Sequence, residues 1–183
     1  MEKTLQQYDV QLKRCRKLFQ KKNQDYGTAW TILRPSSLTD QMYIKAQRIR
    51  SIEENGEQKI EEGVVNEYIG LVNYGIMALL QLAETSAKLE GMDADLLIDS
   101  YDREADKVRS LMIKKNHDYG EAWRDMRVSS LTDLILQKLL RIRQIEDNKG
   151  ATLVSEGLDA NYMDIINYSI FALIRLEEKQ ESI

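Results

Sequence analysis

The ten residues KKNQDYGTAW at Lys21–Trp30 recur almost unchanged as KKNHDYGEAW at Lys114–Trp123, 93 residues further along the chain. Similarity at a fixed spacing within one chain indicates a duplicated structural unit. We therefore expect two copies of one unit, a first repeat at residues 1–92 and a second repeat at residues 93–183. We expect the two repeats to pack together as a single globular body.

The correspondence extends outward from this segment through most of each repeat. SSLTD, for example, occurs at residues 36–40 and again at residues 129–133. The single histidine, the single cysteine and the single proline are each absent from the other copy; they are His117, Cys15 and Pro35. We therefore assign none of these three residues to a function that both repeats share.

Apolar residues in both repeats recur at steps of three and four, the spacing of one face of an α-helix. The stripe of the first helix consists of Leu5, Tyr8, Leu12, Cys15 and Phe19 in one copy, and of Ile98, Tyr101, Ala105, Val108 and Met112 in the other. No strand pattern of alternating residues between turns is present. The predicted fold class is all-α, a tandem-duplicated antiparallel helical bundle with pseudo-two-fold symmetry, with about six long helices plus short helical turns.

Turn and capping residues predict where these helices begin and end. Gly27 should end the first helix of the first repeat, because glycine readily adopts the left-handed conformation at a helix end. The second helix of each repeat should begin with a capping box, at Ser37–Asp40 and at Ser130–Asp133. The third helix should run from about Val64 to Glu90, and its counterpart from about Leu158 to Lys179.

The composition is that of a globular protein and excludes a disordered or disulfide-stabilised chain, with 43% hydrophobic residues and one cysteine in 183 residues. The 26 Lys and Arg against 30 Asp and Glu give a formal net charge of −4. With no global basic field, we do not expect nucleic acid as a direct ligand. No apolar run is long enough for a membrane span and no secretion signal opens the chain, so we expect a cytoplasmic protein without a membrane partner.

A lysine lies on the apolar stripe of the second helix in each repeat, at Lys45 and at Lys138. An unpaired buried ammonium group is costly, so each lysine should meet a carboxylate, a set of carbonyl oxygens or a bound anion. Arg48 and Arg141 lie one turn further on the same side and could form a two-point cation clamp with the lysines. The alternative is a lysine whose stem packs in the core while its ammonium group reaches water.

Asn73 and Asn167 lie among apolar residues of the third helix of each repeat. Such an amide could join helices through hydrogen bonds, or it could bind the base edge or a sugar hydroxyl of a ligand. The acidic residues on neighbouring helices could also neutralise the lysines and arginines. A self-satisfied network of salt bridges would then need no ligand.

The repeated segment KKNxDYGxAW places aromatic side chains next to amides, an acid and lysines. Its polar and aromatic residues are Lys22, Asn23, Asp25, Tyr26 and Trp30 in the first repeat, and Lys115, Asn116, Asp118, Tyr119 and Trp123 in the second. Aromatic faces beside positive charge suit a flat heterocycle with attached phosphates. The structural alternative is a hydrophobic lid in which the tryptophan closes the end of the bundle.

Together, KNxDYGxAW, SLTD, KAxRIxxIE and a late INY resemble the nucleotide modification associated domain 1 family, helical proteins of bacteria and phages. The resemblance covers nearly the whole chain, once in each half. It implies a role near nucleotide or modified-DNA metabolism.

A more distant resemblance is to the all-α NTP pyrophosphohydrolases of the MazG and dimeric dUTPase type, in which E-x-x-E and E-x-x-D acids hold magnesium. The first pair of positions is filled here by Lys45 and Arg48, and by Lys138 and Arg141. The second pair holds Glu67 with Gly70, and Asn161 with Asp164. The resemblance thus implies Mg²⁺ as a cofactor, whereas cations in the acidic positions favour direct contact with phosphate or a site without catalysis.

Our leading hypothesis is the binding or processing of a nucleotide or another small phosphorylated compound, with equivalent half-sites in the two repeats. Phosphate contacts would come from Lys45, Arg48, Lys138 and Arg141, the aromatic residues of the repeated segment would flank the ring, and Asn73 and Asn167 would orient it.

Two alternatives stay open. A divergent metal-dependent NTP pyrophosphohydrolase would use Glu53, Glu146, Glu67 or Asp164 as catalytic acids. A helical scaffold without catalysis would act through a protein partner or as a homo-oligomer, and its polar core residues would only fix the register of the helices.

Overall fold

The computed structural model describes residues 1–56, 63–151 and 156–181, which form seven α-helices and two 3-10 turns and no strand. The first repeat contains α1 (Glu2–Tyr26), η1 (Ala29–Ile32), α2 (Pro35–Asn55), α3 (Val64–Ala83) and α4 (Ser86–Glu90). The second repeat contains α5 (Ala94–Tyr119), η2 (Ala122–Asp125), α6 (Val128–Asp147) and α7 (Leu158–Glu181). The all-α prediction is confirmed, and three long helices recur in the same order in both repeats.

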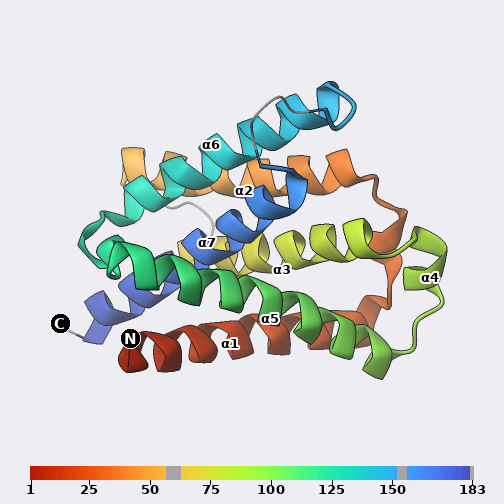
Figure 1. Ribbon diagram of the computed structural model, residues 1–183, viewed down its shortest axis with the longest axis horizontal. Coiled ribbons are helices and arrows are strands. Elements are labelled where there is room, and N and C mark those ends of the chain that lie inside the picture. The colour runs from red at the N-terminus through yellow and green to blue at the C-terminus, as the bar shows by residue number, and fades with distance from the viewer. Residues whose placement is uncertain (57–62, 152–155, 182–183) are drawn as a thin grey trace.

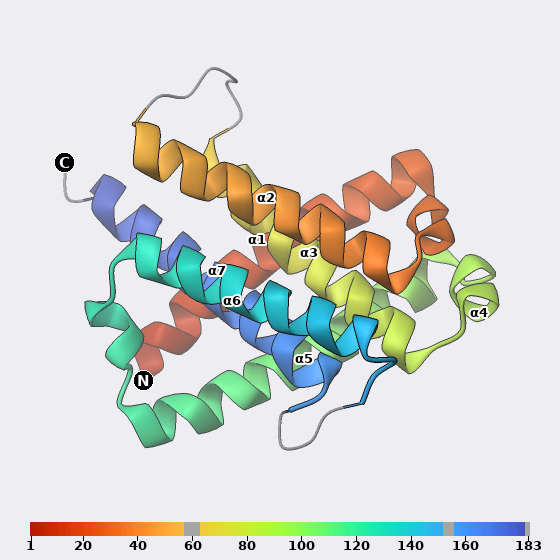
Figure 2. The ribbon, with the colours of Figure 1, turned by 90° about the horizontal axis from the view of Figure 1, so that it is seen from above.

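The six long helices form three layers of two, and each repeat contributes one helix to every layer (Figures 1 and 2). In Figure 1, α2 and α6 lie at the top, α1 and α5 at the bottom, and α3 and α7 between them. The two middle helices pack on each other and on helices of both outer layers. Buried apolar residues of both repeats therefore form one continuous core.

The second helix of each repeat begins earlier than the capping boxes predict. α2 begins at Pro35 after the N-cap residue Arg34, and α6 begins at Val128 after Arg127, and neither N-cap residue has a side-chain capping hydrogen bond. The predicted starts were wrong. In α2, Pro35 suits the first turn, because the backbone N–H that proline lacks would have no partner there. α6 begins at the equivalent residue, Val128, without a proline.

The third helix of the first repeat is shorter than predicted. α3 ends at Ala83, and a separate short helix, α4, follows it. Thr85 caps α4, because its side-chain oxygen accepts a hydrogen bond from the backbone N–H of Lys88 at 3.3 Å. A threonine that caps a new helix ends the preceding one, a signal that the apolar spacing alone does not reveal.

Two equivalent polar clusters join the repeats at the layer formed by α2 and α6. In one, the Thr39 hydroxyl donates to Glu146 Oε1 at 2.8 Å and lies 3.0 Å from the Tyr162 hydroxyl. The other contains Thr132, Glu53 and Tyr68, with oxygen–oxygen distances of 2.9 and 2.7 Å from the threonine hydroxyl. Burial raises the pKa of both glutamates, and the hydrogen bonds from threonine only partly offset it.

The close approach of α3 to α7 depends on Gly75. A Cβ atom at this position would lie 2.6 Å from Cγ1 and 3.1 Å from Cδ1 of Ile166, well inside van der Waals contact. The Ile166 side chain therefore packs directly on the backbone of α3.

We predict that Gly75→Ala lowers the free energy of unfolding by about 1–3 kcal/mol, because the added methyl group overpacks the interface. The loss should appear despite the higher helix propensity of alanine, which favours the variant by about 1 kcal/mol. Urea unfolding followed by circular dichroism measures it. Gly91→Ala is the control, since its methyl group would meet two backbone oxygens at 3.5 and 3.9 Å, both at ordinary contact distance. Equal stability of the two variants would show that Gly75 does not set the spacing of α3 and α7.

A second prediction concerns pH. A carboxyl group whose pKa is raised in the folded state contributes stability below its unfolded value of 4.5, and this contribution is lost as the pH rises through the raised value. The double variant Glu53→Gln/Glu146→Gln keeps a neutral hydrogen-bond acceptor at both sites. As the pH rises from about 4 to about 7, the free energy of unfolding of the double variant should therefore increase relative to that of the parent protein.

Urea titrations of both proteins across this range test the prediction. Glu54→Gln is the control, because Glu54 is exposed and pairs with Arg50 on the same helix. A difference between parent and double variant that does not change with pH would contradict the assignment.

Candidate ligand-binding site

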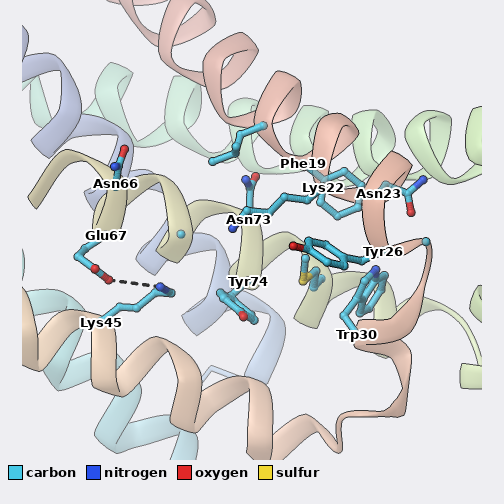
Figure 3. Close-up of a pocket in the computed structure, with 14 residues that line it drawn as sticks. Phe19, Lys22, Asn23, Tyr26, Trp30, Lys45, Asn66, Glu67, Asn73 and Tyr74 are labelled. Carbon is cyan, nitrogen blue, oxygen red and sulfur yellow. Dashed lines mark hydrogen bonds and ion pairs between the residues drawn. The ribbon is translucent and has the colours of Figure 1, made fainter. Parts of the chain in front are cut away.

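A cavity of about 500 Å³ opens in the first repeat, where the end of α1, the turn η1, α2 and α3 meet (Figure 3). It is lined by Leu18, Phe19, Lys22, Asn23, Tyr26, Gly27 and Trp30, and by Lys45, Asn66, Glu67, Gly70, Asn73, Tyr74 and Met77. A volume of this size is typical of pockets for small molecules, which range over roughly 300–1,000 Å³.

The repeated segment forms one wall of this cavity because a glycine ends α1. Gly27 has a φ of 58°, a left-handed value that favours glycine, and its N–H donates to the carbonyl oxygen of Asn23 at 2.8 Å. The chain then reverses into η1 and brings the half-buried Trp30 next to Asn23 and Tyr26 at the edge of the cavity (Figure 3). Tyr26 is 73% exposed and forms the outer rim.

Positive charge predominates on the cavity walls. Lys45 Nζ lies 3.3 Å from Glu67 Oε2, and the guanidinium of Arg48 donates to the other oxygen of the same carboxylate. The Lys45 ammonium also lies 5.7 Å from the centre of the Tyr74 ring. Lys22 has no ion pair within the described part of the chain. The described residues that line the cavity thus include two lysines and one carboxylate, a balance that favours an anionic ligand.

Two polar atoms on the wall of the cavity are buried without a hydrogen-bond partner among the described residues: Asn23 Oδ1 and Trp30 Nε1. One is an acceptor and the other a donor. The indole N–H of Trp123 also lacks a partner in the second repeat, so the acceptor at Asn23 is the more informative of the two. Buried polar groups are normally satisfied, so these two atoms are exceptions among the described residues.

Asn73 borders the cavity, but its amide already joins three helices. Its oxygen accepts a hydrogen bond from the Tyr101 hydroxyl at 2.8 Å, and its nitrogen donates to the carbonyl oxygen of Cys15 at 3.1 Å. The equivalent amide of the second repeat, Asn167, accepts from Tyr8 at 2.7 Å. Both asparagines therefore connect helices in the core, which is the structural alternative that the sequence left open for them.

The same region of the second repeat is closed by its own side chains. Asp164 replaces Gly70, and its two carboxylate oxygens lie 2.5 Å from Lys115 Nζ and 2.7 Å from Lys138 Nζ. Burial lowers the pKa of Lys115, but the hydrogen bond and the charge of Asp164 outweigh it, so the pKa is raised. Asp164 is 3% exposed and binds one buried lysine, Lys138, and one half-buried lysine, Lys115.

An aromatic pair completes the closure of the second repeat. Trp123 is 6% exposed and stacks on Phe171, with ring centroids 4.1 Å apart and planes 3° from parallel. Phe171 replaces Met77, and Asn116 is buried with its amide nitrogen 3.1 Å from Met112 Sδ. The expected equivalence of the two half-sites is therefore absent from the structure, although the repeated motif is nearly identical.

The four proposed catalytic acids do not gather in one place. Glu67 pairs with Lys45 and Arg48, and the other three acids are bound by lysines or threonines away from the cavity wall; these three are Glu53, Glu146 and Asp164. Across residues 1–56, 63–151 and 156–181, no group of three or more His, Cys, Asp or Glu side chains could hold a metal ion. The described residues therefore do not form a magnesium site of their own.

The described residues also contain no helix that is both long and apolar enough to cross a membrane.

The cavity contains six of the residues that the sequence proposed as ligand-binding in the first repeat: Lys22, Asn23, Tyr26, Trp30, Lys45 and Asn73. The others lie elsewhere: Arg48 is turned to Glu67, and Asp25, Asp118, Tyr119 and Arg141 are exposed. Sequence reasoning missed Gly70 and Tyr74 as wall residues. The difference between Gly70 and Asp164 at equivalent positions was the available signal, because a missing side chain leaves space.

The fold and this cavity define a class, an all-helical tandem-repeat protein with a cation-lined pocket in its first repeat. Residues 22–82 and 115–176 match the family described as nucleotide modification associated domain 1, one segment in each repeat. The matches cover more than half of the chain, and the chain belongs to this family. No curated protein and no solved structure gives a match, so the resemblance to pyrophosphohydrolases stays a prediction.

We predict that Lys138→Met lowers the free energy of unfolding by about 1–3 kcal/mol, because the buried Asp164 keeps only one of its two ammonium partners. Lys45→Met should cost less. The Lys45 side chain is 26% exposed rather than 9%, and Glu67 keeps Arg48. Chemical denaturation of the two variants measures the difference, and an equal or larger loss for Lys45→Met would contradict this account of the two pairs.

Proposed function

We propose that the cavity of the first repeat binds a nucleotide or another small phosphorylated compound. The observation that carries this proposal is the combination of lysines and aromatic faces on the wall of one open cavity, with Lys22 and Lys45 beside Trp30, Tyr26 and Tyr74. In Figure 3 both lysine side chains reach into the space between α1, α2 and α3. Phosphates are recognised by such cations, and heterocycles by such rings.

The electrostatic balance supports an anionic ligand. Among the described residues that line the cavity, Glu67 is the one carboxylate and pairs with Lys45, and Lys22 adds a further positive charge. Because the cavity is partly shielded from water, a phosphate there interacts with these groups more strongly than it would at an open surface. A phosphorylated compound therefore complements the site better than a neutral one.

The other end of the cavity suits a flat ring. Trp30 offers an aromatic face, and stacking of a base on such a ring contributes about 1–3 kcal/mol. The description of the family, which concerns nucleotide modification, agrees with a ligand of this kind.

A thermal-shift screen of ribo- and deoxyribonucleoside mono-, di- and triphosphates, each with and without Mg²⁺, tests the proposal. A ligand present at 100 times its dissociation constant should stabilise the protein by about 2.7 kcal/mol, which corresponds to a rise of several degrees in Tm. Calorimetric titration should then give one site per chain. If no compound at millimolar concentration changes the Tm, the proposal fails and a scaffold role is favoured.

Two lysines that are neighbours in sequence give a matched pair of variants. Lys22→Ala should weaken binding of the stabilising nucleotide by roughly tenfold or more, because it removes a charge-assisted hydrogen bond to phosphate. Lys21→Ala is the control, since Lys21 is exposed and lies outside the cavity wall. Equal affinities of the two variants, measured by calorimetry at one ionic strength, would contradict the assigned phosphate contact.

A further inference from the structure

The two repeats show the same pair of lysines in two states, and the difference lies in one side chain. In the second repeat, a carboxylate of the chain itself lies between Lys115 and Lys138, at 2.5 and 2.7 Å. The equivalent lysines of the first repeat are Lys22 and Lys45, and both line the open cavity. The residue equivalent to Asp164 is Gly70, which also lines it.

The first repeat cannot supply this carboxylate, because glycine has no side chain. A Cβ atom on Gly70 would lie 2.9 Å from Cδ and Cε of Lys45 and 3.2 Å from its Nζ. The Lys45 side chain thus packs against the backbone of α3 at Gly70, the position where the second repeat has Asp164. The atoms in the way are the far end of a flexible side chain, which can move aside for an incoming group.

The acid of the first repeat stands one helical turn earlier and faces other partners. Glu67 takes the position of Asn161 and binds Lys45 and Arg48. It makes no ion pair with Lys22, which has none within the described residues. Among the described residues, the first repeat therefore has a lysine without an ion-pair partner where the second repeat has a lysine bound by a buried carboxylate.

We infer that the ligand of the first repeat supplies the anionic group that Asp164 supplies in the second repeat, and that this oxyanion binds over Gly70 between Lys22 and Lys45. The second repeat is then a closed copy, occupied by its own side chain. The identity of the ligand rests on the function proposed above, but the position of the anion does not. A phosphate ester and a free phosphate share this chemistry, so the experiment includes both.

A pair of substitutions of equal size tests the position. Gly70→Asp places the internal carboxylate of the second repeat into the first, whereas Gly70→Asn adds nearly the same volume without charge. With a deoxynucleoside monophosphate as the probe, Gly70→Asp should bind roughly tenfold or more weakly than Gly70→Asn, because like charges repel at short distance. Inorganic phosphate should show the same order in thermal shift, and the unphosphorylated nucleoside should not distinguish the two variants. Equal binding of the phosphorylated probes would overturn the inference.

The reverse substitution tests whether these lysines accept an external anion. Asp164→Gly removes the carboxylate from between Lys115 and Lys138 and should lower the Tm. Sodium acetate, which replaces the lost side chain, should raise the Tm of this variant more than that of the parent protein, and sodium chloride at the same ionic strength should not. Equal shifts in variant and parent would overturn the inference. If Asp164→Gly does not fold, the comparison at Gly70 decides.

The two sets of results separate this inference from the proposed function. If nucleotides bind Gly70→Asp and Gly70→Asn equally, the proposed nucleotide site is supported, but the anion does not bind over Gly70. If acetate stabilises Asp164→Gly but no nucleotide binds to the parent protein, the proposed nucleotide binding fails and the anion site is supported.

Discussion

An ammonium group in the apolar seam of a helical bundle requires an opposite charge beside it, because an unpaired charge costs several kcal/mol when it leaves water. Lys45 and Lys138 impose this requirement on the two repeats. Each repeat meets it with one acid on its third helix, Glu67 in the first and Asp164 in the second. The two acids differ in position by a single helical turn, and this difference decides which repeat has an open cavity.

The packing around the tryptophan also differs between the two repeats. In the second repeat, Trp123 stacks on Phe171, which replaces Met77, and is buried. Where Gly70 leaves the space open, Trp30 remains half-buried on a cavity wall. Since α3 and α7 pack on each other in the middle layer, the closed repeat supports the open one. A duplicated fold can thus keep an imperfectly packed site in one copy while the other provides a filled core.

The periodicity of apolar residues and the internal repeat were sufficient to predict the all-α fold and the register of the two copies, because both depend on local spacing. The cost of burying charge predicted that each seam lysine would meet a carboxylate, carbonyl oxygens or a bound anion, and the structure shows a carboxylate beside both Lys45 and Lys138. The start of α2 and the end of α3 were predicted wrongly, since several capping signals compete there. The closure of the second site was also unforeseen. The motif residues are the same in both copies, whereas space depends on side chains from other helices.

The network around Glu67 also explains why an open site can persist without its ligand. Because Glu67 holds Lys45 and Arg48 at the base of the cavity, these two groups have a counter-charge before any anion arrives. The fold therefore does not depend on the ligand, and the cations are already oriented, which reduces the entropy lost on binding. Lys22 is exposed and adds a further ammonium group to the wall from α1. In the second repeat, Asp164 already lies between Lys115 and Lys138, whereas in the first repeat the position between Lys22 and Lys45 is left for the anionic group of the ligand.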